Sequence, residues 1–144
     1  GHDVGFIVTG GTEEGREAIL ELGRLLIYEG GRSQVNENLV LPMLDEVLAV
    51  AEEAPEQAGR AAFLLAESRV RQSRPQEAAD YFLRAAEVNA EDPAFVARSL
   101  YRAAEMLDAA GQSAERDAII QRLRESFPDS EYTEQAVELQ ESES

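Results

Sequence analysis

The chain has 144 residues, of which 44% are hydrophobic, and a formal net charge of -16. This length and composition predict one globular domain, and the sequence contains no run of ~18 apolar residues that could form a membrane-spanning helix. All 13 basic residues are arginines and 29 residues are acidic, so nucleic acid is an unfavourable partner because a phosphate backbone requires a basic face. With no cysteine, the chain has neither disulfides nor thiolate sites.

The first two residues, Gly-His, resemble the remnant of a cleaved tag, and we expect residues 1–12 to form a flexible or strand-like arm. Val4–Val8 is the only strand-like run. It is followed by Thr9–Thr12 (TGGT), a succession similar to the strand, glycine turn and helix of nucleotide-binding folds. However, Glu13 and Glu14 would place carboxylates where phosphates bind, and no βαβ unit follows. A nucleotide-binding enzyme fragment therefore remains a distant alternative.

The main domain is expected to span residues 13–140 and to begin with a helix over residues 13–28. Thr12 can cap this helix, and the acidic residues of the first turn suit the helix dipole. Glycines 30 and 31 are expected to end it. Its apolar positions recur at spacings of three and four residues: Ile19, Leu22 and Leu26.

A polar loop is expected over residues 32–38, followed by a second helix over residues 39–54. Pro42 is tolerated best in a first helical turn, so regular helix is predicted to begin near Leu41. The expected buried side of this helix consists of Val47, Leu48, Val50 and Ala51.

Prolines and small polar residues mark the later helices. Pro55, Pro75 and Pro93 each suit a first helical turn, Ser113 suits a cap, and Pro128 prevents a helix from continuing. The predicted helices cover residues 55–72, 75–88, 93–111, 113–126 and 130–140. Residues 141–144 form an acidic tail that we expect to be disordered. Seven helices with short links predict an all-α fold of antiparallel hairpins.

The helices share an internal register. The first helices of three pairs align with steps of 43 and 38 residues at Leu22-Gly23, Leu65-Ala66 and Ala103-Ala104, and the same register aligns Gly30, Ser73 and Gly111. The second helices align at Met43-Val47-Val50, Ala78-Phe82-Ala85 and Arg116-Ile120-Leu123. Small residues at such positions allow helices to approach closely, and large neighbours fill the remaining space.

This pattern resembles the tetratricopeptide repeat, with L-G-x2-Y in one helix, A-x3-F in the next and a closing proline. The resemblance covers roughly 115 residues and implies a short right-handed solenoid. The first two repeats exceed the usual ~34 residues. Arg69 replaces the expected aromatic and Arg116 the expected alanine. The phrase from Phe127 to Tyr132 (FPDSEY), followed by Ala136, is similar to repeat junctions in bacterial envelope members, which implies a periplasmic module, with a cytoplasmic scaffold as the alternative.

In tetratricopeptide proteins the first helix of each pair lines a concave peptide-binding face. The resemblance therefore implies a groove formed by Leu20, Arg24, Tyr28, Arg60, Phe63, Glu67, Arg71, Arg98, Tyr101 and Glu105, with Glu17, Ile27, Val70 and Asp108 on the same strip. Phe63 and Tyr101 are expected to be exposed among the arginines. The alternative is that these residues are simply solvated or covered by a neighbouring helix. Leu20, Phe63 and Tyr101 stand where chaperone-tail-binding members carry carboxylate-clamping lysine and asparagine, so that activity is not expected.

No catalytic, cofactor or metal site can be assembled from the sequence. Its single histidine lies in the tag-like segment, and its adjacent acids point in different directions on a helix. The residues expected in the core are Phe82, Leu100, Ile120, Leu123 and Phe127. The expected function is a non-enzymatic scaffold that binds a peptide or helix of another protein. The alternative is a self-associating structural module, in which the arm and end helices would contact a second copy.

Overall fold

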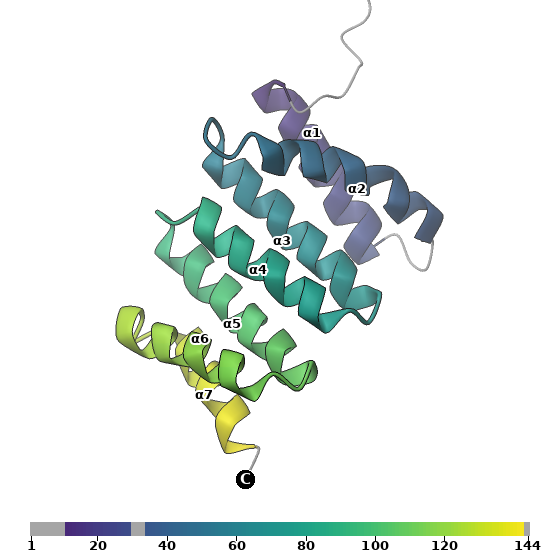
Figure 1. The fold of residues 1–144 in the computed structure, drawn as a ribbon. Helices are drawn as coiled ribbons and strands as arrows, with labels where there is room; N and C mark the ends of the chain where they lie inside the picture. The colour runs from purple at the N-terminus through teal and green to yellow at the C-terminus, as the bar shows by residue number, and fades with distance from the viewer. Residues whose placement is uncertain (1–10, 30–33, 143–144) are drawn as a thin grey trace, which may run out of the picture.

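The computed structural model describes residues 11–29 and 34–142, and these form a stack of helices (Figure 1). No strand occurs in these two ranges. The helices are α1 (Glu13–Arg24), α2 (Gln34–Ala49), α3 (Pro55–Arg71), α4 (Pro75–Val88), α5 (Pro93–Ala109), α6 (Ser113–Ser126) and α7 (Glu131–Glu141). A π-helical segment, η2 (Leu25–Glu29), extends α1. The all-α class predicted from the sequence is confirmed.

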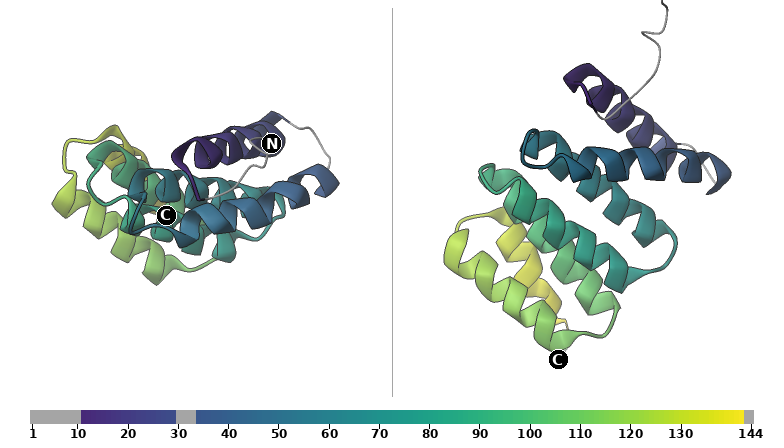
Figure 2. Two further views of the ribbon diagram at one scale, coloured as in Figure 1. Left: turned by 90° about the horizontal axis from the view of Figure 1, so that it is seen from above. Right: turned by 45° about the horizontal axis from the view of Figure 1, so that its top comes forward.

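Consecutive helices pack against each other as antiparallel hairpins, α1–α2, α3–α4 and α5–α6, and α7 packs on α5 and α6 (Figure 1). The helices form two layers. In the odd-numbered layer α1 also contacts α3, and α5 contacts α7. The view from above shows that the first hairpin is displaced sideways from the last one (Figure 2, left). This arrangement leaves one face of the stack to α1, α3 and α5.

Local sequence signals set most helix boundaries. Proline occupies the first turn of α3, α4 and α5, where its missing N–H requires no intrahelical partner. The backbone N–H of Gly15 donates to the Thr12 hydroxyl at 3.0 Å, which confirms the predicted cap of α1. Asp92 and Ser130 cap α5 and α7 in the same way. The N-cap of α6 is Gln112, so Ser113 is the first helical residue rather than the cap.

The prediction for α2 was wrong at both ends. The helix begins at Gln34, inside the predicted polar loop, and Pro42 lies in its interior. Glu37 is only 1% exposed and accepts a hydrogen bond from the Ser68 hydroxyl of α3, and Arg71 also lies 3.5 Å from its carboxylate. These tertiary contacts explain why a polar segment forms buried helix. The helix ends at Ala49, and a turn leads to Pro55, which disfavours helical conformation in the residue before it.

Burial confirms the aligned register in the second and third hairpins. On the first helices Ala66 and Ala104 are completely buried, and Leu65 and Ala103 are at most 1% exposed. On the second helices the equivalent pairs are also at most 1% exposed: Ala78 and Arg116, Phe82 and Ile120, Ala85 and Leu123. The predicted core residues Phe82, Leu100, Ile120 and Leu123 are buried, whereas Phe127 is only partly buried.

The first hairpin departs from this register. Leu22, the equivalent of Leu65, is 39% exposed, and Leu26 is half-buried. The core side of α1 and η2 consists instead of Ile19, Leu20, Gly23 and Ile27. On α2 Val47 is buried, but the predicted Leu48, Val50 and Ala51 are only partly so.

Arg116, which replaces a small alanine, is 1% exposed and is accommodated by acidic neighbours. Its guanidinium binds Asp108 of α5 at 2.6 Å and Asp117 at 2.9 Å. The two carboxylates are partly exposed, so these ion pairs lie at the boundary between core and solvent.

The arm segments Val4–Val8 and Thr9–Gly10, and the last two residues of the predicted tail, lie outside the described residues.

Candidate functional site

A groove of ≈ 470 Å³ lies on the face formed by α1, η2, α3 and α5. Its lining combines apolar side chains with three arginines and two glutamates. The lining residues are Leu20, Glu21, Arg24, Tyr28, Glu56, Arg60, Phe63, Leu64, Phe95 and Arg98. Arginines therefore outnumber acids here, although the whole molecule has a charge of -16.

The apolar base of the groove is organised around Phe63 on α3. Its ring packs edge-on against Phe82 with centroids 4.9 Å apart, and against Phe95 of α5 at 5.8 Å. Leu20 and Leu64 are 2% and 7% exposed. Aromatic pairs of this kind contribute roughly 0.5–1.5 kcal/mol beyond the area they bury. The base of the groove is thus continuous with the core.

Gly59 explains how α5 comes close enough to form this base. A Cβ built on Gly59 would lie 2.6 Å from Cβ of Asn89 and 3.3 Å from the ring of Phe95. Only a glycine allows this approach without a shift of the neighbouring chain. Phe63 lies one turn later on the same helix, so Gly59 and Phe63 both contact Phe95.

Arg98 on α5 is the arginine of the groove that has no polar partner among the described residues. Its guanidinium lies over the Phe63 ring at 4.5 Å from the centroid, a cation–π contact, and its side chain is exposed. Arg24, by contrast, forms ion pairs with Glu21 and Glu29, each at 2.7 Å. Arg98 therefore presents donors that are free to bind an acidic group in the groove.

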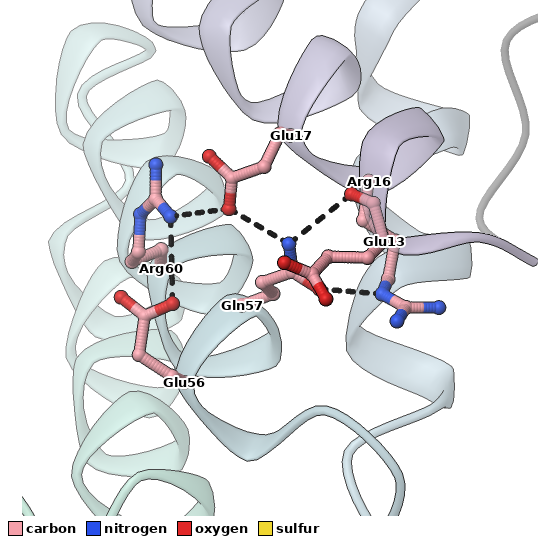
Figure 3. A network of polar contacts seen from close by, with 6 residues as sticks. All are labelled: Glu13, Arg16, Glu17, Glu56, Gln57 and Arg60. Atoms are coloured by element: carbon pink, nitrogen blue, oxygen red, sulfur yellow. Dashed lines mark hydrogen bonds and ion pairs between the residues drawn. The ribbon is translucent and has the colours of Figure 1, made fainter.

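A polar network at the α1–α3 contact adjoins the groove, which two of its residues, Glu56 and Arg60, also line (Figure 3). Its centre is Gln57, which is 6% exposed. The Gln57 amide accepts from Arg16 Nε at 2.5 Å and donates to the Glu17 carboxylate at 2.7 Å. Arg60 donates to Glu17 at 2.8 Å and to Glu56 at 3.4 Å. Arg60 is thus held by two carboxylates and positions α1 on α3.

A second polar chain runs from η2 to α5 beside the groove. Tyr28 donates its hydroxyl hydrogen to Glu67 of α3 at 3.2 Å, and Glu67 forms an ion pair with Arg102 of α5. Arg102 also pairs with Glu105, which accepts from the Tyr101 hydroxyl at 3.4 Å. These contacts link three helices through long side chains.

Titration of these groups lies away from neutral pH. Burial and the charge of Glu67 raise the pKa of Tyr28, and burial and the charge of Glu105 raise the pKa of Tyr101. Hydrogen bonds from Gln57 and Arg60 lower the pKa of Glu17. The two phenols therefore stay neutral and Glu17 stays ionised across the neutral range.

Six of the ten residues predicted for the groove line it: Leu20, Arg24, Tyr28, Arg60, Phe63 and Arg98. The expectation that Phe63 is exposed was wrong, because it is 5% exposed beneath Phe95 and Arg98. Tyr101 is half-buried, with its ring 6.0 Å from that of Tyr132 on α7, the last helix of the stack.

The other three predicted residues have structural partners. Glu67 and Glu105 bind Arg102, and Arg71 contacts Glu37 of α2 at 3.5 Å. On the wider strip Ile27 is buried, so it belongs to the core. Glu17 lies in the Gln57 network and Asp108 pairs with Arg116, and neither lines the groove.

The prediction missed four lining residues: Glu21, Glu56, Leu64 and Phe95. Phe95 lies three residues before Arg98, and Glu56 lies four before Arg60. Positions three and four apart share a helix face. That spacing was the sequence signal that could have identified Phe95 and Glu56 as lining residues.

Among the residues that the structure describes, no group of three or more His, Cys, Asp or Glu side chains could hold a metal ion. No helix in the described parts of the chain combines the length and apolarity needed to cross a membrane. Neither a family model, nor a curated protein, nor a solved structure matches the chain. The class of protein is therefore defined by the fold, an all-α stack of helical hairpins with a repeated register.

Proposed function

We propose that this protein is a non-enzymatic scaffold of the tetratricopeptide type that binds a peptide or helix of another protein in the groove of α1, α3 and α5. The observation that carries the proposal is the composition of that groove, an aromatic and aliphatic base beside an arginine without a polar partner among the described residues. Aromatic residues and arginine dominate the binding energy of protein interfaces.

The repeated register supports the tetratricopeptide assignment. Equivalent positions in the second and third hairpins have the same burial, and small residues lie at the close helix contacts. The first repeat is longer than the usual unit, and its burial pattern departs from that of the other two repeats. The early start of α2, at Gln34, accounts for part of the extra length.

The lining also supports a proposal for the chemistry of the ligand. An aromatic or aliphatic side chain fits over Leu20, Leu64 and Phe95, and a neighbouring acidic side chain would bind Arg98. Charge-assisted hydrogen bonds of guanidinium to carboxylate are about twice as strong as neutral ones. A peptide carrying an apolar anchor next to Asp or Glu is therefore the expected ligand.

The proposal is tested by selecting binders from a displayed library of random peptides on the immobilised protein. Selected peptides are expected to contain an apolar anchor beside an acidic residue. Their affinities, measured by isothermal titration calorimetry, should fall by about 1 kcal/mol or more in Arg98→Ala and in Tyr28→Ala. Phe63→Ala is unsuitable because Phe63 belongs to the core.

Glu87→Ala is the control. Glu87 is exposed on α4, outside the groove, and Arg84 at 3.3 Å is its only ion-pair partner among the described residues. The affinity of the Glu87→Ala variant for the selected peptides should equal that of the wild type. Binders that are insensitive to both groove substitutions, or a library that yields no binders, would contradict the proposal.

A further inference from the structure

The exposed large hydrophobic residues of the described chain are confined to the first hairpin. They are Leu22, Leu25, Tyr28 and Leu39, with exposed fractions of 39%, 38%, 48% and 65%. Tyr28 lines the groove. Leu22 and Leu25 lie outside the groove lining and share one face of α1 and η2 with the exposed Ala18.

The repeat register shows what this face corresponds to in the other hairpins. The equivalents of Ala18, Leu22 and Leu25 are Ala61, Leu65 and Ser68 on α3, and Ser99, Ala103 and Met106 on α5. All three α3 residues are at most 1% exposed, Ser99 and Ala103 are completely buried, and Met106 is partly buried. The same face is therefore covered in the second and third hairpins and exposed in the first.

In each case the preceding hairpin provides the cover. Ala61 and Leu65 belong to the core cluster that contains Ile19, Leu44 and Val47 of α1 and α2. Ala103 belongs to the cluster of Ala66 and Phe82, from α3 and α4. The face of α1 thus has the composition of a contact between hairpins, and no hairpin precedes it in the described residues.

The opposite end of the stack is different. The exposed positions of α7 include Glu131, Glu134, Gln135 and Glu138, and its apolar residues pack on α5 and α6. A polar outer face is the usual property of a terminal repeat that caps a solenoid. Among the described residues the stack therefore has a polar end at α7 and an apolar end at α1.

Charge selects the kind of partner for the α1 end of the stack. Glu14 is exposed four residues before Ala18, and Glu21 is exposed four residues before Leu25, so both acids lie in the same rows as the apolar residues. Glu21 shares the guanidinium of Arg24 with Glu29, so acids still outnumber arginines beside this face. A second copy would bring identical carboxylates together, and its α7 end is acidic as well. A helix with basic residues beside an aliphatic stripe would satisfy both the carboxylates and the leucines.

We propose that the end face of α1, defined by Glu14, Ala18, Glu21, Leu22 and Leu25, docks an amphipathic helix of another protein, with an aliphatic stripe flanked by arginine or lysine. The docked helix takes the place that the preceding hairpin occupies on α3 and α5. Leu22 and Leu25 lie outside the groove lining, and Glu21 is the residue that the end face shares with the groove, so the two proposed protein-binding surfaces adjoin each other.

The probe is a synthetic helical peptide of about 20 residues, ~30 Å long, with leucines at spacings of three and four and flanking arginines. Its affinity is measured by fluorescence anisotropy at ~0.15 M salt, where distant charges are screened. The double variant Leu22→Gln, Leu25→Gln should bind it about tenfold more weakly, equivalent to ~1.4 kcal/mol. Both leucines are partly exposed, so circular dichroism and the melting temperature should change little.

Three controls decide the result. A peptide with the same leucines and flanking glutamates, and an arginine peptide without leucines, should both bind about tenfold more weakly than the probe, or weaker. Tyr28→Ala should leave binding unchanged, because the groove is not involved. Equal binding of the arginine peptide without leucines, or no loss in the double variant, would overturn the proposal. Sedimentation that shows a dimer dissociated by the double substitution would overturn it in favour of a second copy. Stronger binding of the probe after removal of residues 1–10 would overturn it in favour of this segment of the same chain as the occupant.

Discussion

Ser73 and Gly111 occupy equivalent turns 38 residues apart, and both adopt a positive φ, of 60° and 77°. The hydrogen bonds around them also correspond. Arg74 donates to the carbonyl of Arg69 at 2.9 Å, and Gln112 donates to the carbonyl of Leu107 at 2.8 Å. The repeat register, inferred from side-chain pattern, is therefore also a repeat of backbone conformation at the end of α3 and α5.

Ser73→Gly is expected to stabilise the protein. A left-handed conformation costs an L-residue about 1–2 kcal/mol, and glycine removes this strain at some cost in conformational entropy. The free energy of unfolding, measured in urea, should rise by ~0.5–1 kcal/mol. Gly111→Ala should lower it by about 1 kcal/mol, although a side chain there meets open space, because the strain is in the backbone. A decrease for Ser73→Gly would contradict this explanation.

Gly59→Ala is expected to destabilise the protein by ~1–3 kcal/mol, because the added methyl would lie 2.6 Å from Cβ of Asn89. Gly23→Ala is the matched comparison. Its added methyl would meet only the ends of the Leu44 and Leu64 side chains, at 3.2 to 3.3 Å, and these can move. Its effect should be much smaller, since alanine also favours helix by about 1 kcal/mol. Equal melting temperatures for the two variants would show that the α4–α5 connection is not rigid.

Ala66→Leu and Ala104→Leu are each expected to lower the free energy of unfolding by ~1–3 kcal/mol. Both alanines are 0% exposed at equivalent positions, so a larger side chain would force neighbouring helices apart. Ala118→Leu, at an exposed position of α6, is the control and should be nearly neutral. Unchanged denaturation curves for both buried variants would refute the close packing of the hairpins.

Acid should weaken the contact between α1 and α3 through Glu17. The folded-state pKa of Glu17 is lowered from 4.5 by hydrogen bonds from Gln57 and Arg60, so its stabilising contribution is present above pH 4.5 and is lost as the pH falls. The difference in unfolding free energy between wild type and Glu17→Gln should therefore shrink as the pH is lowered below 4.5. A difference that is constant from pH 7 to strong acid would mean that Glu17 is not ionised in these contacts.

Most of the helix boundaries could be predicted because local chemistry decides them. Pro75 and Val88 bound α4 as predicted, and Pro55 begins α3 as predicted, since proline fixes the first turn whatever the helix packs against. The start of α2 could not be predicted in this way. Its first turns are held by the contact of Glu37 with Ser68 and Arg71, residues about thirty positions further along the chain.

In the groove, too, some features could be predicted from local sequence and others depend on tertiary contacts. Periodicity identified the helices that form it and six of its residues, because positions three and four apart share a helix face. Whether an aromatic on that face is exposed depends on the next hairpin, and Phe63 is covered by Phe95 and Arg98. The approach of α5 that produces this cover depends on Gly59, whose importance arises from a contact with Asn89 and not from its own helix.

By itself the sequence determined the all-α class, the order of the hairpins and the register of their small and large residues. These follow from short-range rules of helix capping, proline geometry and periodicity, which act within a few residues. Only the tertiary structure decided which apolar residues are buried, because burial depends on what the neighbouring hairpin places opposite them. Leu22 and Leu65 illustrate this, since equivalent leucines in the register are 39% and 1% exposed according to whether a hairpin precedes them in the described stack.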